Sequence, residues 1–186
     1  MLDDTPEGFE RQMELLRRDP RAYIAMIDRE LADDPDNSHL YFARYQAWKR
    51  LGDLHRAFDD IIRAIATKDQ AVSRLCAGEI LMQLGRYREA LAMLARGEAM
   101  DTPERWAGMW GPHYQATCHA HLGEEAEAMA ACDKLEDDDW LPGLHGTPRG
   151  DKAEVRAELR RRARAAVAAA KPLPPPKGCR RPDSED

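Results

Sequence analysis

One stretch of the sequence brings together side chains that could bind a metal ion. Its five imidazole and thiol groups belong to His113, Cys118, His119, His121 and Cys132. Nitrogen and sulfur are the ligand atoms that zinc prefers. On a helix, however, Cys118 and His121 share one face while His119 points well away from it. We therefore expect packing and surface roles, with no metal and no other cofactor. A metal-binding or enzyme-accessory protein that uses these residues is kept as an alternative.

Catalytic motifs are missing from the sequence. It has no Gly-rich phosphate loop, no Gly-x-Ser-x-Gly and no His-Glu-x-x-His, which are the patterns that position nucleophiles, phosphates or catalytic zinc. Carboxylates are plentiful, but a run such as residues 136–139 is typical of solvated surface. We expect that the chain is not an enzyme, and we assign no catalytic residue.

Basic residues gather at the C-terminal end. Residues 149–186 carry 11 Lys and Arg against 6 Asp and Glu, whereas the whole chain has a net charge of −6. Lys152, Arg156, Arg160 and Arg164 recur every four residues, so on a helix they form a basic stripe that could neutralise phosphates. No aromatic residue accompanies them to stack on bases. Nucleic-acid binding through this helix is therefore a weaker alternative than attraction to the acidic body of the same chain.

Composition also predicts the cellular location of the protein. No stretch approaches the roughly 20 apolar residues that cross a bilayer, and the acidic first ten residues do not resemble a secretory signal. The cysteines lack Cys-x-x-Cys spacing, which is typical of free thiols in a reducing compartment. We expect a cytoplasmic protein without a membrane partner. Arg outnumbers Lys 22 to 6, which suggests a GC-rich bacterial genome.

The side chains above must be positioned by helices, because one pattern recurs three times along the chain. Each copy has a Leu-Gly pair followed, five residues after the Gly, by Ala. The copies are Leu51-Gly52 with Ala57, Leu84-Gly85 with Ala90, and Leu122-Gly123 with Ala128. Apolar residues before and after each Gly follow the 3.6-residue period of a helix. Gly suits the turn because the residue after a helix often has a positive φ.

These copies resemble the tetratricopeptide repeat, a helix–turn–helix unit of about 34 residues. The best copy matches its bulky and small positions with Tyr41, Trp48, Leu51, Gly52, Asp53, Ala57, Ile61 and Ala64. The second copy matches with Gly78, Leu81, Leu84, Gly85, Tyr87, Ala90 and Leu94. The third copy is weaker, because Pro112 and Glu125 replace expected apolar residues. The resemblance implies an all-α fold, a right-handed superhelical solenoid of antiparallel helix pairs.

The repeats divide residues 1–170 into parts of one domain. The repeats are expected at 38–69, 71–103 and 109–140, after a degenerate helical pair at 5–35 whose turn is Asp19-Pro20. Residues 151–170 are expected to form a capping helix, with Asp151 as its N-cap and Glu154 three residues on. Residues 171–186 are expected to form a Pro-rich, basic, disordered tail.

The resemblance also implies a binding surface, because repeats of this family bind partners on the concave face lined by the first helix of each unit. The matching positions hold His39, Phe42, Gln46, Lys49, Leu75, Glu79, Met82, His113 and Thr117. Phe42, Leu75 and Met82 stand where carboxylate-clamping members of the family have polar residues. We therefore expect a helical or extended partner segment with apolar anchors, and we expect Phe42 and Met82 to face water in the free protein.

The leading interpretation is a protein–protein interaction module, with an adaptor, chaperone-like or regulatory role. Its partner is a protein or peptide, and self-association is left open. The sequence does not identify the partner or the pathway.

Overall fold

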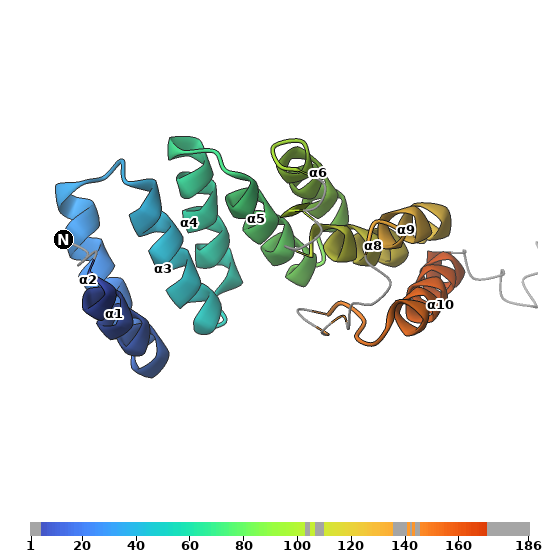
Figure 1. Cartoon of the computed structure of the whole chain (residues 1–186), viewed down its shortest axis with the longest axis horizontal. Coiled ribbons are helices and arrows are strands. Elements are labelled where there is room, and N and C mark those ends of the chain that lie inside the picture. The colour runs from blue at the N-terminus through green and yellow to red at the C-terminus, as the bar shows by residue number, and fades with distance from the viewer. Residues whose placement is uncertain are drawn as a thin grey trace, which may run out of the picture.

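The computed structural model describes residues 5–102, 105–106, 110–135, 141, 143 and 146–170. The described residues form nine helices: α1 (Pro6–Arg18), α2 (Pro20–Asp33), α3 (Ser38–Arg50), α4 (Leu54–Thr67), α5 (Ala71–Gln83), α6 (Tyr87–Glu98), α8 (Gly111–His121), α9 (Glu125–Cys132) and α10 (Lys152–Ala170) (Figure 1). Extended pairing within this part is limited to one isolated bridge between Leu141 and Gly150. The predicted all-α fold of about nine helices is confirmed. The predicted tail at 171–186 lies outside the described residues.

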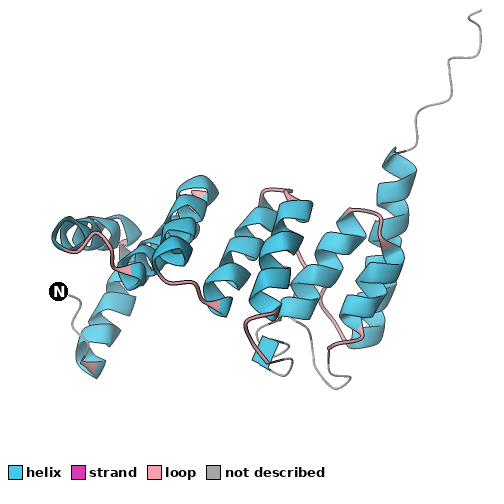
Figure 2. Cartoon of the chain, turned by 90° about the horizontal axis from the view of Figure 1, so that it is seen from above, coloured by secondary structure: helices cyan, strands magenta, loops and turns pink. Residues whose placement is uncertain are grey.

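The helices form consecutive antiparallel pairs that stack into one row. Contacts join α1 to α2, α3 to α4, α5 to α6 and α8 to α9, and each pair also contacts the next one. Figure 2 shows the row ending in α10, which contacts both helices of the last pair. The chain is thus a solenoid of helical hairpins, and none of its described helices has the length and apolarity needed to span a membrane.

The three Leu-Gly pairs form the same turn. Gly52, Gly85 and Gly123 have φ of +77°, +74° and +79°. The residue after each Gly donates a backbone hydrogen bond to a carbonyl of the preceding helix. The bonds run from Asp53 to Trp48 (3.0 Å), from Arg86 to Leu81 (2.8 Å) and from Glu124 to His119 (3.0 Å). This C-terminal motif satisfies a carbonyl that the helix leaves free, and it fixes the direction of the next helix in every unit.

Side-chain caps begin several helices where the sequence predicts them. Asp19 accepts a hydrogen bond from the N–H of Ala22 (3.0 Å), with Pro20 as the first residue of α2. At α10 the predicted capping box forms in both directions. The Glu154 N–H donates to the Asp151 carboxylate (2.9 Å), and the Asp151 N–H donates to the Glu154 carboxylate (3.2 Å). These bonds satisfy N–H groups that would otherwise lack a partner.

Small residues let the two helices of each pair approach closely. Ala57, Ala90 and Ala128 are all 0% exposed. In the second pair, a Cβ added to Gly78 of α5 would lie only 2.7 Å from Cγ of Leu94 on α6. The contact therefore tolerates no methyl group at position 78.

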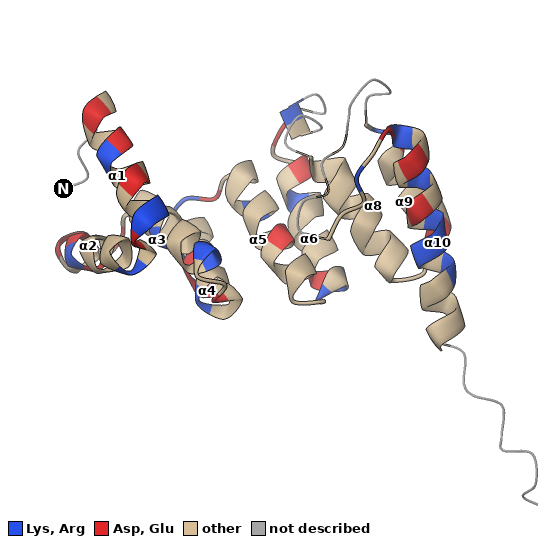
Figure 3. Cartoon of the chain, turned by 90° about the horizontal axis from the view of Figure 1, so that it is seen from below, with Lys and Arg blue, Asp and Glu red and all other residues tan. Residues whose placement is uncertain are grey.

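The last helix covers the end of the row with an apolar stripe. Val155, Leu159 and Ala163 of α10 are at most 1% exposed and belong to one core cluster with Ala116 and Ala128. Beside this stripe, Arg160 and Arg164 of α10 contact Glu125 of α9, and Figure 3 shows basic and acidic positions where these two helices lie side by side. Burial and charge thus hold α10 against the last pair together.

We predict that Gly78→Ala lowers the free energy of unfolding by about 1–3 kcal/mol, because overpacking outweighs the gain in helix propensity. The measurement is urea unfolding of the single variant, of Leu94→Ala and of the double variant. Removing the Leu94 side chain makes room, so Gly78→Ala should cost less in the Leu94→Ala background. An equal cost in both backgrounds would show that this close approach does not constrain the pair.

Candidate partner-binding groove

The groove is open at its N-terminal end, between α1 and α3. A cleft of about 600 Å³ lies there, and its α3 side is formed by His39, Phe42, Ala43 and Gln46. Three of these four are residues that the repeat pattern places on the concave face. His39 is exposed, whereas Phe42 and Gln46 are half-buried. The structure therefore brings these three predicted residues together on an accessible surface.

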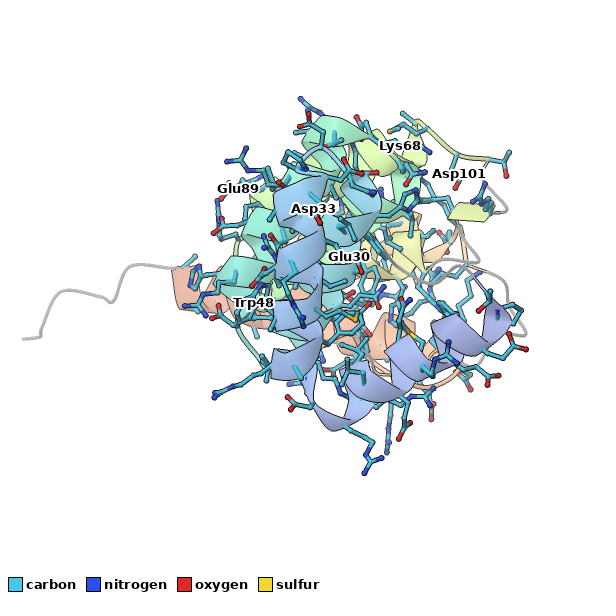
Figure 4. The ribbon with its side chains drawn as sticks, turned by 90° about the vertical axis from the view of Figure 1, so that its left-hand side faces the viewer. Glu30, Asp33, Trp48, Lys68, Glu89 and Asp101 are labelled. Carbon is cyan, nitrogen blue, oxygen red and sulfur yellow. The ribbon has the colours of Figure 1, made fainter. Side chains whose placement is uncertain are left out.

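The opposite side of the cleft comes from the degenerate first pair. Its lining residues are Thr5, Pro6, Phe9, Gln12 and Met13, with Tyr23 of α2 at the base. Seen from the N-terminal end, α1 and α2 diverge from their shared turn (Figure 4). The spacing of three or four residues places the α1 side chains on one face. Phe9 is 58% exposed, which is unusual for so large an apolar side chain.

The α1 residues of the cleft were not predicted from the sequence. Residues 5–35 were expected only to form a degenerate helical pair, although Phe9, Met13 and Leu16 follow helical spacing. Leu16 is buried in the core and Met13 is half-buried, so Phe9 at the solvent end of the same face was the available signal.

Two predicted groove residues pair with each other in the middle of the array. Nζ of Lys49 on α3 lies 2.5 Å from Oε1 of Glu79 on α5, and their side chains are 26% and 8% exposed. Gln83 donates a hydrogen bond to the same carboxylate (2.9 Å). Leu75, also predicted for this face, is half-buried against the neighbouring core cluster. This part of the groove is thus occupied by contacts within the chain.

The expectation that Met82 faces water is wrong. Met82 is 4% exposed and belongs to a core cluster with Leu81, Leu94 and Tyr114. The cluster joins α5 and α6 to α8 of the next unit, so the following repeat contributes to the burial of Met82. Truncating Met82 would therefore change stability as well as any surface.

The predicted residues on α8 are also covered. His113 is 2% exposed and Thr117 is 0% exposed, and the Thr117 hydroxyl donates to the His113 carbonyl (2.9 Å). The His113 ring interacts with the backbone carbonyl of Pro148. We call residues 146–150 the strap. It begins 14 residues after Cys132, the last residue of α9, and no sequence pattern indicated that it would lie against α8.

The five residues first considered as metal ligands have separate roles. Cys118 and Cys132 lie in two different core clusters, and burial raises the pKa of the Cys118 thiol to about 12, which disfavours the thiolate that binds metal. His119 lies 2.7 Å from Glu124, and the His121 ring stacks on Tyr87 with centroids 4.4 Å apart. Among the described residues, no group of three His, Cys, Asp or Glu side chains could hold a metal ion. The metal-binding alternative is thus unsupported.

The basic stripe of α10 is directed toward the chain itself. Arg164 makes two contacts with Glu125, at 3.1 and 3.2 Å, and Arg160 lies 3.9 Å from the same carboxylate. Arg156 pairs with Asp133, and Lys152 donates to the Leu135 carbonyl (2.5 Å). Each cation of the stripe has an acceptor on or next to α9. These contacts favour the predicted attraction between the basic end and the acidic body over a surface devoted to phosphates.

Comparisons with known proteins agree with this architecture. No protein-family model matches the chain. A stretch of 79 residues, 42% of the chain, is 35% identical to tetratricopeptide repeat protein 28 of Mus musculus. The match spans only 3% of that protein's length. A crystal structure of MamA resembles the chain with a TM-score of 0.65 and 16% identity, covering 89% of this chain and 92% of that one. At this identity the likeness shows the fold alone.

The buried imidazole on α8 predicts a pH dependence of stability. Burial lowers the pKa of His113 to about 4; the Pro148 carbonyl opposes this and nearby Arg162 adds to it. The unfolded chain has the ordinary pKa of about 6.5 and binds a proton first as the pH falls. The stabilising contribution is therefore complete above pH 6.5 and is lost progressively down to pH 4, by about 3 kcal/mol in total.

Urea unfolding at pH 7 and pH 4.5 measures this effect. His113→Asn is the matched variant, because it keeps a side-chain N–H donor but has no group that titrates in this range. We expect the wild-type chain to lose about 2 kcal/mol more than the variant between the two pH values. Equal losses would contradict the burial of a neutral His113, because carboxylates that titrate in this range are common to both proteins.

Proposed function

We propose that this chain, which is a tetratricopeptide-type repeat protein, is a protein–protein interaction module that holds an apolar-anchored partner segment between α1 and α3. The observation that carries the proposal is the cleft itself, which has Phe9 58% exposed at one side and Phe42 at the other. A large apolar side chain in water is unfavourable, and burying one fully gains about 1.5–3 kcal/mol. A partner that covers Phe9 recovers that free energy.

The shape of the cleft favours a helical partner segment. Both sides are faces of helices, with residues spaced by three or four along about two turns. None of the lining residues is Asp, Glu, Lys or Arg. A short amphipathic helix that inserts its apolar face would complete a three-helix contact, which is the helix-in-groove mode of recognition. The neutral lining indicates that the inserted face is apolar and that any charges of the partner stay at the rim.

The rest of the array supports this role as a rigid frame. The stacked pairs fix α3 through the bidentate contact of Arg44 with Asp60, at 2.6 and 2.8 Å, so only α1 and the side chains of the cleft need to adjust. An adaptor, chaperone-like or regulatory role is compatible with this geometry. In each of these roles the chain binds a partner and performs no chemical step.

The test uses Phe9→Ala with Phe42→Ala, and Met100→Ala as the control, because Met100 is 46% exposed away from the cleft. A partner is first captured from the native organism by the wild-type chain and then titrated against each variant. We expect the double variant to bind at least tenfold more weakly, which requires about 1.4 kcal/mol. The Met100 variant should bind like the wild type.

The rival surface is tested in the same titration. Charge reversal of Arg160 and Arg164 to Glu removes these positive charges of α10 and their contacts with Glu125, and it changes no residue of the cleft. If that reversal abolishes binding while the Phe9 and Phe42 variant binds normally, the partner uses the basic helix and the cleft proposal fails. Melting temperatures of all variants show whether a loss of binding comes from unfolding.

A further inference from the structure

A short segment of the same chain lies against α8, where the Pro148 carbonyl interacts with the ring of His113. The strap, residues 146–150, includes buried Thr147, Pro148 and Gly150. Beneath it, His113 and Thr117 are 2% and 0% exposed although they stand at positions that line the groove in a stacked repeat. The strap therefore lies where a partner segment would lie if the groove continued to this unit.

Backbone groups of the strap make contacts at Gly146, Pro148 and Gly150. Nη1 of Arg162 donates to the Gly146 carbonyl (2.5 Å). Gly150 exchanges two backbone hydrogen bonds with Leu141, at 2.9 and 3.0 Å, and the Pro148 carbonyl faces the ring of His113. Backbone hydrogen bonds and small side chains are how grooves hold extended segments. The strap thus has the chemistry of a bound peptide rather than that of a core element.

The fit of the strap leaves one polar atom of the groove unused. Nε2 of His113 is buried and has no hydrogen-bond partner among the described residues. Thr117, one turn along α8 from His113, lines a cleft of about 520 Å³ together with Met82, Gly146 and Arg162. A buried polar atom without a partner is unfavourable. A segment that brings a hydroxyl or amide group to Nε2 would satisfy the site better than the strap does.

We propose that the groove face of α8 is a second segment-binding site, occupied by the strap and open to an extended partner segment after the strap is displaced. The partner segment has small residues or Pro, and it carries a hydroxyl or amide side chain that reaches His113. Three described helices, α4, α5 and α6, lie between this site and α3 of the first cleft. The inference does not depend on the function proposed for that cleft.

Because the strap is part of the same chain, its expected affinity for α8 as a free peptide can be calculated. A segment joined to its site by a short linker experiences an effective concentration on the order of 1 mM. A strap that fills the site more than about 90% of the time must bind as a free peptide with a Kd of about 0.1 mM or below. A synthetic peptide with the sequence of residues 141–152 is therefore the appropriate probe, because it contains the strap and its bridging residue.

The experiment measures fluorescence polarisation of this labelled peptide with the full chain. Thr147→Gly with Pro148→Gly removes two buried side chains of the strap and frees its backbone, which favours the displaced strap, and it keeps the capping box of α10. We expect a Kd of about 0.1 mM or below for this variant and binding at least tenfold weaker for the wild type, whose own strap competes. A scrambled peptide should bind neither protein. Equal binding to both proteins, or none to the variant at 1 mM, overturns the proposal.

A second readout does not depend on the peptide. Titration of the His113 ring signals by NMR should give a pKa near 4 in the wild type and a value closer to 6.5 in the variant. A pKa near 4 in a folded variant would show that the strap does not cover the ring and would overturn the proposal. If the double variant does not fold by circular dichroism, Arg162→Ala replaces it in the peptide titration, because it removes the bond to Gly146 together with a contact to Glu158. It does not replace it in the NMR titration, because the Arg162 charge itself lowers the pKa of His113.

One further control tests the two proposed binding sites separately. Phe9→Ala with Phe42→Ala should leave the strap peptide's Kd unchanged in the Thr147 and Pro148 background. A loss of peptide binding in that combination would place the peptide in the cleft between α1 and α3 and would overturn the assignment to α8.

Discussion

The close approach of the two helices in each pair is the contact on which the rest of the structure depends. It is permitted by buried small residues, Ala57, Ala90 and Ala128, and by Gly78, which has no room for a Cβ beside Leu94. Paired helices at this distance interlock in a fixed register, and the positive-φ glycine turns repeat that register from unit to unit. The register then decides which side chains of the first helices face the groove.

The same groove has different properties along its length. At the N-terminal end α1 diverges from α2 and leaves Phe9 exposed beside α3. In the middle, Lys49 and Glu79 pair across adjacent units, and at the far end the strap and α10 cover α8. If partners bind as proposed, a segment meets an open apolar cleft first and reaches the α8 face only after the strap is displaced. A repeat scaffold that looks uniform in sequence thus has one open and one covered stretch of groove.

Local signals in the sequence predicted the fold well. The Leu-Gly turns, the Asp19-Pro20 start of α2 and the Asp151–Glu154 capping box depend on residues that are near each other in the chain, and the structure shows each of them. The burial of Met82 and His113 was not predictable in this way. It arises from Tyr114 in the next unit and from the strap 35 residues beyond His113, and such contacts leave no periodic pattern. The helical spacing of Phe9 could have been recognised in the sequence. Residues 5–35 resemble the repeat so weakly, however, that Phe9 was not assigned to the groove.

Site-specific photo-crosslinking tests most directly the proposal that partners bind this chain at the cleft between α1 and α3. A photoreactive phenylalanine analogue replaces Phe9, Phe42, Met100 as the control, or an exposed residue of α10, and the crosslinked partner residues are identified by mass spectrometry. We expect positions 9 and 42 to crosslink to one contiguous partner segment, at residues spaced by three or four, and position 100 not to crosslink. Crosslinks confined to position 100, or to analogues placed on α10, would contradict the proposal.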